Sequence, residues 1–252
     1  MNLERRAQIA DLIKQQRTVK NAELMERFGI SIETVRRDLD YLEKQGVLRK
    51  VYGGAVATAL LNSEPEYASR AEMKHQQKDK IAKEAVKLIR PGDAVYMGVG
   101  TTVQAMAQYM KNIGPITVFT NALRTAVELS EIADCTVILT GGRLRAKELT
   151  LSEFPSEENL EHFNLDKAFI GIGGINEEGI TDFHIGEARL HRRMIDNATQ
   201  SIALADSGKM GLRAMNKVCT LEEIDLVITD DEAPLQAVAA LESAGAKVIL
   251  AK

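Results

Sequence analysis

Residues 31–39 read Ser31-Ile32-Glu33-Thr34-Val35-Arg36-Arg37-Asp38-Leu39, and this stretch decides how the N-terminal part of the chain folds. The Ser31 hydroxyl can accept a hydrogen bond from a first-turn amide, which favours a helix that begins here. At about 100° per residue, the apolar side chains form one stripe that must face a core: Ile32, Val35, Leu39 and Leu42. The other face carries groups that can hydrogen-bond phosphates and base edges in a DNA groove. The side chains predicted to contact DNA from this helix are Ser31, Thr34, Arg36, Arg37 and Tyr41.

A solvated helix face is the alternative interpretation of two adjacent arginines, and the sequence on both sides argues against it. Residues 3–16 form an amphipathic helical pattern that residues 18–20 interrupt. Asn21 can cap a second short helix over residues 22–28, and Gly29 is a natural C′ residue for that helix. Two short helices joined by a turn that contains glycine predict a helix-turn-helix.

The residues after Leu42 predict a β-hairpin wing. Gly46 ends the helix, residues 47–52 favour a strand, Gly53 and Gly54 favour a tight turn, and residues 55–56 favour the return strand. Two basic side chains of the first strand, Arg49 and Lys50, are placed to meet DNA phosphate. The N-terminal region is therefore predicted to be a winged helix-turn-helix.

The order and spacing of these residues resemble the DeoR family of bacterial transcriptional regulators, of the DeoR and GlpR type. The matching positions are Arg5, Ile9, Ile13, Ser31, Thr34-Val35-Arg36-Arg37-Asp38-Leu39 and Tyr52-Gly53-Gly54-Ala55. The resemblance implies a protein that binds double-stranded operator DNA and works as a dimer or a tetramer. It also implies that residues 1–56 are the DNA-binding domain.

Length and composition are those of an ordinary soluble protein with one small and one medium domain. The chain has 252 residues, of which 45% are hydrophobic and 27% charged. No apolar run approaches the roughly 20 residues that a membrane span needs, and we expect no membrane partner and no secretory leader. The two cysteines, Cys135 and Cys219, lie in apolar segments and suggest no disulfide framework, so we expect a cytoplasmic protein.

Charge is divided unevenly along the chain, whose formal net charge is −4. Residues 1–60 hold 11 basic and 8 acidic side chains, whereas the remainder holds 21 basic and 28 acidic ones. A positive N-terminal domain beside an acidic one suits a specific DNA-binding regulator whose second domain avoids DNA.

After a predicted linker at residues 57–73, the pattern of residues 74–252 alternates between short apolar runs and helices. A helix is predicted for residues 74–89. The predicted strands are residues 94–97, 116–119, 136–139, 168–172, 201–204, 226–228 and 248–250. The predicted helices between them are residues 102–110, 122–129, 186–197 and 234–244. Buried strands that alternate with helices imply an α/β fold with a doubly wound, mostly parallel sheet.

Polar and glycine-rich loops follow these strands, where ligands of such sheets bind. Glycines let backbone amides approach a ligand, and hydroxyls, cations and helix N-termini suit a small anion, with a phosphate preferred at the Gly100-Thr101-Thr102 turn. Ordinary turn chemistry is the alternative for each loop taken singly. Gly98-x-Gly100-x-x-Val103 lacks the third glycine of a dinucleotide fingerprint, so we expect no nucleotide cofactor. The predicted effector-binding residues are Gly98, Gly100, Thr101, Thr102, Asn121, Gly141, Gly142, Arg143, Gly173, Gly174, Asp182 and Lys209.

These loops extend the resemblance to the DeoR family over nearly the whole chain. It implies a fold like those of ribose-phosphate isomerases and CoA transferases and an effector that is a phosphorylated sugar. The resemblance further implies a repressor of a carbohydrate-catabolism operon that this effector releases. Two departures bear on effector identity: Gly98 stands where the family usually has Asp, and residues 150–155 replace a Ser-Leu-Val-Gly-Pro stretch.

The rival function is a sugar-phosphate isomerase, because some side chains of the second domain could move protons: Asp182, Glu187, Asp206 and Lys209. The four histidines show no tight ligand pair and no nearby cysteine, so no metal site is predicted: His75, His162, His184 and His191. The basic run at residues 189–193 is a solvated helix face, a subunit contact or an edge of the effector pocket.

Overall fold

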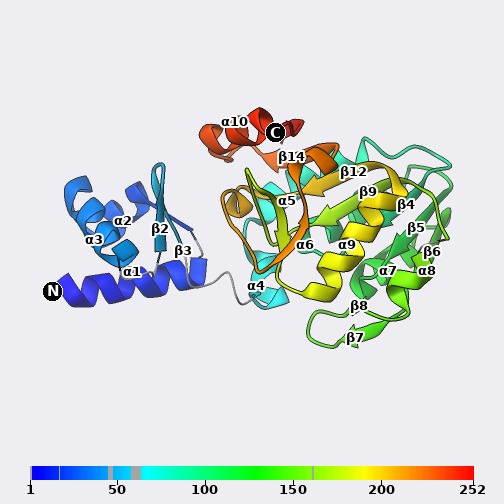
Figure 1. The fold of residues 1–252 in the computed structure, drawn as a ribbon, viewed down its shortest axis with the longest axis horizontal. Coiled ribbons are helices and arrows are strands. Elements are labelled where there is room, and N and C mark those ends of the chain that lie inside the picture. The colour runs from blue at the N-terminus through cyan, green and yellow to red at the C-terminus, as the bar shows by residue number, and fades with distance from the viewer. Residues whose placement is uncertain (1, 17, 45–47, 58–63, 161) are drawn as a thin grey trace. The chain divides into compact units, whose positions relative to one another are not determined.

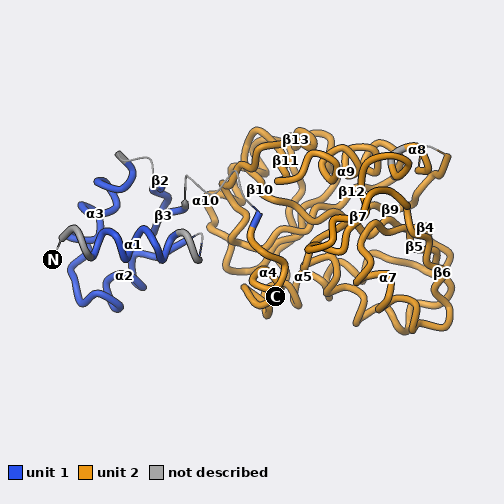
Figure 2. Tube along the Cα trace, turned by 90° about the horizontal axis from the view of Figure 1, so that it is seen from below, with its two compact units in different colours: residues 1–64 blue, residues 65–252 orange. Residues whose placement is uncertain are grey.

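The computed structural model describes residues 2–16, 18–44, 48–57, 64–160 and 162–252. These residues form two compact units, residues 1–64 and residues 65–252 (Figures 1 and 2). Each unit has its own hydrophobic core.

The first unit is a three-helix domain with a small antiparallel sheet. Its helices are α1 (Asn2–Gln16), α2 (Asn21–Phe28) and α3 (Ile32–Lys44). Strands β1 (Thr18–Lys20), β2 (Leu48–Val51) and β3 (Gly54–Ala57) pair in the order β1-β3-β2. The β2–β3 hairpin is the predicted wing, and the segment predicted to interrupt the helices, residues 18–20, is itself a strand of this sheet.

Two of the three predicted helix-end residues that lie in the described part of this unit are confirmed. The Ser31 hydroxyl accepts a hydrogen bond from the Thr34 amide at 3.4 Å and so caps α3. Gly29 ends α2 with a left-handed φ of 59°. The predicted Asn21 cap is wrong, because α2 begins at Asn21 itself and Lys20 is the N-cap residue. Gly46, the predicted end of α3, lies outside the described residues.

The second unit is built on a seven-stranded sheet in which every described pairing is parallel, in the order β15-β14-β12-β9-β4-β5-β6. Each predicted strand is present, with small differences at the ends. The strands are β4 (Ala94–Met97), β5 (Ile116–Thr120), β6 (Cys135–Leu139), β9 (Leu165–Gly171), β12 (Ala198–Leu204), β14 (Leu226–Asp230) and β15 (Val248–Ala251). The predicted doubly wound α/β architecture is therefore confirmed.

Helices cover both faces of this sheet (Figure 1). One core packs side chains of four elements against it: α5 (His75–Val86), α6 (Thr101–Gln104), the 3-10 turn η1 (Ala107–Tyr109) and α7 (Leu123–Ser130). The other core includes side chains from α8 (Ser156–Leu160), α9 (Ile185–Asn197) and α10 (Leu235–Ser243). No described helix is both long and apolar enough to cross a membrane.

Several elements of the second unit were not predicted. Residues 67–72, within the predicted linker, form helix α4 (Tyr67–Glu72). Short antiparallel sheets flank the main one: β7 (Arg143–Arg145) pairs with β8 (Thr150–Ser152), and β10 (Gly174–Asn176), β11 (Gly179–Asp182) and β13 (Asn216–Cys219) pair together. Two 3-10 turns, η2 (Ser207–Lys209) and η3 (Leu221–Glu223), complete the fold.

The strand order reverses between β4 and β9. From β4 the chain proceeds to β5 and β6 on one side, whereas β9 is followed by β12, β14 and β15 on the other. A doubly wound sheet opens a crevice at the carboxyl ends of its strands where the order reverses. The loops after β4 and β9 are therefore the first place to look for a ligand site.

Candidate functional site

The outward face of α3 carries the side chains of the predicted recognition surface. Arg36 and Arg37 are both exposed. The Arg37 Nε donates to the Glu33 carbonyl at 3.4 Å, which leaves its terminal guanidinium nitrogens for other partners. The Ser31 and Thr34 hydroxyls lie 3.3 Å apart at the start of the helix, where their first role is in the cap.

Asp38, in the same stretch, faces inward. It is 1% exposed and accepts hydrogen bonds from the Nε atoms of Arg5 and Arg6, each at 2.7 Å. The Arg6 guanidinium also lies 4.1 Å from the centre of the Tyr41 ring. Asp38 therefore joins α1 to α3 and fixes the angle at which α3 presents its arginines, while Tyr41 is partly covered by Arg6.

The wing carries a lysine that is paired with carboxylates and a tyrosine ring that is exposed. Lys50 Nζ hydrogen-bonds Asp40 and lies 3.9 Å from Glu43, and the hydrogen bond to Asp40 is the main cause of its raised pKa. A phosphate must therefore compete with Asp40 for Lys50. Tyr52, at the hairpin turn, is 87% exposed. The side chain of Arg49 lies outside the described part of the chain.

In the second unit, the loop after β4 packs directly on the end of β9. Gly98 donates its amide to the Phe169 carbonyl at 2.9 Å. Gly100 has a φ of +141°, and a Cβ on it would lie 3.1 Å from the Gly171 Cα. A Cβ on Gly171 would collide with the Val99 carbonyl. Glycine is thus required here for close backbone approach, which accounts for part of the glycine-rich pattern without a ligand.

His191 fills the space beside Gly98. A Cβ at position 98 would lie 2.8 Å from its Nε2, so glycine makes room for the ring. The imidazole is fully buried, and within the described residues neither ring nitrogen has a hydrogen-bond partner. Burial lowers the pKa of His191 to about 4, so the ring is neutral near pH 7 and its 3.6 Å approach to Asp182 is not an ion pair.

A cluster of cations surrounds Asp206, at the end of β12. Lys78 of α5 is only 5% exposed, and desolvation lowers its pKa to about 8. Asp206 partly opposes this shift, whereas the nearby charges of Lys209, Arg70 and Lys74 add to it. Lys74 Nζ also donates to the Ser207 hydroxyl at 2.8 Å. Three carboxylates oppose these four cations, because Lys74 also pairs with Glu232 at 3.1 Å and Arg70 pairs with Glu148.

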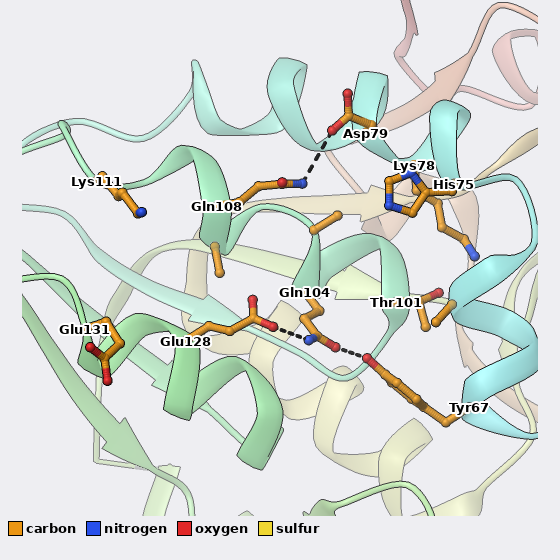
Figure 3. Close-up of a pocket in the computed structure, with 13 residues that line it drawn as sticks. Tyr67, His75, Lys78, Asp79, Thr101, Gln104, Gln108, Lys111, Glu128 and Glu131 are labelled. Atoms are coloured by element: carbon orange, nitrogen blue, oxygen red, sulfur yellow. Dashed lines mark hydrogen bonds between the residues drawn. The ribbon is translucent and has the colours of Figure 1, made fainter.

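Lys78 and Thr101 line one cavity of about 520 Å³ between α4, α5, α6 and α7. Figure 3 shows Lys78, His75, Thr101 and Tyr67 at one end of this cavity and Lys111 with Glu131 at the other. Thr102, the next residue, is buried and does not line it. Of the two threonines, Thr101 is therefore the one whose hydroxyl a ligand in this cavity can reach.

The remaining predicted effector residues are placed apart from Lys78. The Asn121 amide accepts from the Tyr96 hydroxyl at 2.9 Å and donates to the Leu151 carbonyl at 3.1 Å, so both of its polar atoms are engaged. Arg143 is exposed and pairs with Glu153 at 2.7 Å. Gly141 and Gly142 have positive φ angles in the turn before β7. Gly173 and Gly174 allow close packing against β11 and the Leu212 backbone.

The groups considered for proton transfer also lie in separate environments. Glu187, 1% exposed, accepts from the Thr150 hydroxyl at 2.7 Å and pairs with Arg145. Asp182 lies beside His191, whereas Asp206 and Lys209 belong to the cluster around Lys78. Among the described residues, no group of three or more His, Cys, Asp and Glu side chains is placed to hold a metal ion.

The basic run of α9 lines a shallow groove with Lys217. Arg192 pairs with Asp196 at 2.9 Å and with Glu223, and these carboxylates hold its pKa above the usual value. Arg192 is thus neutralised within the fold, and a subunit contact at this run stays a prediction.

Lys78 was missed although the sequence carries a signal for it. It lies three residues before Ile81 and seven before Ala85, on the buried stripe of α5. A lysine on an apolar helix stripe is either buried with partners or part of a site. Tyr67 and Arg70 have no comparable signal, because α4 buries none of its side chains and has no apolar period.

Comparisons with known proteins cover both units. Residues 5–59 match the model of the DeoR-like helix-turn-helix domain, and residues 73–231 match that of the DeoR C terminal sensor domain. The putative aga operon transcriptional repressor of Escherichia coli O157:H7 is 33% identical over 98% of this chain and 93% of its own. The glycerol-3-phosphate regulon repressor of Escherichia coli K12 is 31% identical over 90% of each chain. The solved structure of ribose 5-phosphate isomerase A from Methanocaldococcus jannaschii is 18% identical over 54% of each chain, with a TM-score of 0.40.

Proposed function

Because the chain belongs to the DeoR family of transcriptional regulators, we propose that it represses a carbohydrate-catabolism operon and leaves its operator when a phosphorylated sugar binds. Like its relatives, it is a DNA-binding regulator, and it is not an enzyme. We assign DNA reading to residues 1–56, and effector binding and oligomerisation to residues 74–252.

The observation that carries the proposal is a buried lysine, Lys78, that lines one cavity together with Thr101. The charges of Lys209, Arg70 and Lys74 act on Lys78, and Asp206 opposes them. Arg70 and Lys74 are themselves paired with Glu148 and Glu232. A phosphate beside Lys78 and Thr101 would accept hydrogen bonds from the ammonium and the hydroxyl, and its charge would stabilise the desolvated ammonium. The cavity volume of about 520 Å³ is ample for a sugar phosphate.

One relative is named for a glycerol-3-phosphate regulon, and that name supports a phosphorylated effector. A ligand changes DNA affinity only if it binds one arrangement of the protein better than the other, so the effector must favour the arrangement with low operator affinity.

DNA recognition is proposed to rest on the exposed arginines of α3, with Arg37 reading a base edge and Arg36 meeting phosphate. One such helix reads only a few base pairs, so useful specificity needs paired half-sites and a symmetric dimer or tetramer. Sedimentation of the full chain at micromolar concentration tests this part. A monomer that binds its operator with full affinity would contradict it.

A thermal-shift panel on the full chain tests the effector. The probes are inorganic phosphate, glycerol 3-phosphate, ribose 5-phosphate and glucose 6-phosphate, each paired with its unphosphorylated counterpart where one exists. A ligand that binds only the folded protein raises the melting temperature with its occupancy. We expect at least one phosphorylated probe, and no unphosphorylated one, to raise it and to weaken operator binding measured by fluorescence anisotropy.

Variants separate the site from the rest of the protein. Thr101→Ala and Lys78→Met should lose the shift and retain operator binding, whereas Lys247→Ala, which removes an exposed lysine that does not line the cavity, should respond like the parent. A normal response of both Thr101→Ala and Lys78→Met would mean that the phosphate binds elsewhere.

A further inference from the structure

Helix α4 is too short to be stable without contacts from the rest of the unit. It has six residues, none of them buried, and its N-cap residue makes no side-chain cap hydrogen bond. Isolated helices of fewer than about 12 residues are marginal in water. Whether α4 stays helical and docked therefore depends on the contacts that other elements make with it.

Lys78 makes the first of these contacts. Its Nζ donates to the Met73 carbonyl at 2.7 Å and to the Arg70 carbonyl, so one ammonium satisfies two carbonyls at the end of α4. A helix end leaves such carbonyls without partners, and a cation there also suits the helix dipole. An ammonium has three N–H donors, so a third remains for a ligand in the cavity that Lys78 lines.

Tyr67 makes the second contact, at the start of α4. Its hydroxyl donates to Gln104, the last residue of α6, whose first residue is Thr101. Its ring lies 4.3 Å from the guanidinium carbon of Arg124. Both ends of α4 are thus attached to residues that line the same cavity as Thr101, namely Lys78 and Gln104.

The third contact lies away from the cavity. Arg70, in the middle of α4, pairs with Glu148, and both side chains are largely buried. The Arg70 Nε also donates to the Pro65 carbonyl at 3.0 Å. Glu148 belongs to the loop between β7 and β8 and does not line the cavity, so it holds α4 without touching the effector site.

We infer that α4 is the element through which the effector acts on DNA binding, and that Lys78 joins α4 to the effector. The inference rests on the proposed function, because it assumes an anion beside Lys78 and Thr101. An anion there accepts the third N–H of the Lys78 ammonium and so fixes the orientation in which the other two N–H groups meet the carbonyls of α4. Since α4 begins two residues after the first residue of the second unit, its docking fixes where the connection to the DNA-binding unit starts.

The test weakens the attachment of α4 at a pair that does not line the cavity. Glu148→Gln removes the charge that holds Arg70, and the matched control Glu153→Gln removes the charge of the exposed pair with Arg143. Operator affinity of the full chain is measured with and without the phosphorylated probe that raises the melting temperature most, and the ratio of the two affinities is the coupling. Probe affinity without DNA is measured by calorimetry.

We expect Glu148→Gln to reduce the coupling by at least about fivefold while the probe still binds in the absence of DNA, at least as tightly as to the parent. Glu153→Gln should match the parent in both measurements. Parental coupling in Glu148→Gln, with the parent protein responding to the probe, would overturn this inference alone. A parent that responds to no phosphorylated probe would overturn the proposed function and this inference with it.

Hydrogen exchange on the parent protein tests the same inference without a variant. Amides of residues 67–73 should become better protected when the probe binds, because their helix is held more firmly. Unchanged exchange over these residues, with protection gained around Thr101, would overturn the inference even if Glu148→Gln failed to fold.

Discussion

Effector affinity should fall steeply above pH 8, because the lysine proposed to meet the phosphate titrates there. Burial and the neighbouring charges of Lys209, Arg70 and Lys74 lower the pKa of Lys78 to about 8, although Asp206 opposes the shift. A group with a lowered pKa loses its proton at lower pH in the free protein, and a bound phosphate favours the protonated form. Binding must therefore take up a proton, and the uptake grows as the pH rises through 8.

The size of the effect follows from that pKa. If only the charged form binds, the apparent dissociation constant rises by about tenfold between pH 7 and pH 9, or about 1.4 kcal/mol. The second ionisation of a phosphate monoester is complete above pH 7, so the ligand contributes little to this change. Calorimetry at constant ionic strength, in two buffers of different ionisation enthalpy, should give an uptake of about half a proton at pH 8.

The control is Lys78→Arg, whose guanidinium stays charged throughout this range. If this variant binds the probe, its affinity should be nearly independent of pH from 7 to 9. A parent protein whose affinity changes by less than about twofold over the same range, with no proton uptake at pH 8, would refute the role given to Lys78.

Three further changes test other parts of the molecule. Arg37→Ala should cost about 1–3 kcal/mol of specific operator binding and relax the preference at one base pair, as a competition assay with single-base operator variants would reveal. Asp40→Asn should leave Lys50 with only the weaker pair to Glu43 and so make it more available to phosphate. The salt dependence of DNA binding should become steeper, by up to about 0.9 in slope for this contact, and an unchanged slope would contradict this use of the wing. Gly98→Ala should lower the free energy of unfolding by about 1–3 kcal/mol, because its Cβ would lie 2.8 Å from the His191 ring, and thermal unfolding measures the loss.

The main sheet could be predicted because its inner strands are buried and so read as continuous apolar runs, although the edge strands β6 and β15 are only partly buried. The run at residues 94–97 matches β4 residue for residue. The small antiparallel sheets could not be predicted in this way. Strands such as Gly174–Asn176 have three residues and no alternation, and β11 finds its partner β13 only after α9 and β12 have been completed.

The candidate site was harder to predict than the fold, because loop residues of the same type serve different purposes. Gly100 allows the loop after β4 to approach the end of β9. The side-chain amide of Asn121 hydrogen-bonds Tyr96 and Leu151, and Arg143 pairs with Glu153. Composition cannot separate these uses from ligand binding. Lys78 was overlooked because lysine normally lies at the surface, although its position on the stripe with Ile81 marks it.

The buried carboxylate of Asp38 has a consequence for genetics. The carboxylate is buried and cannot contact the operator. It nevertheless accepts hydrogen bonds from both Arg5 and Arg6 and so fixes the orientation of the recognition helix α3 relative to α1. A screen for constitutive expression should therefore recover alleles at codons 5, 6 and 38 beside those at codon 37. Alleles at codons 5, 6 and 38 would yield protein that is scarce in the cell or cleared by proteases. Alleles at codon 37 would yield normal amounts of a protein that no longer recognises its operator.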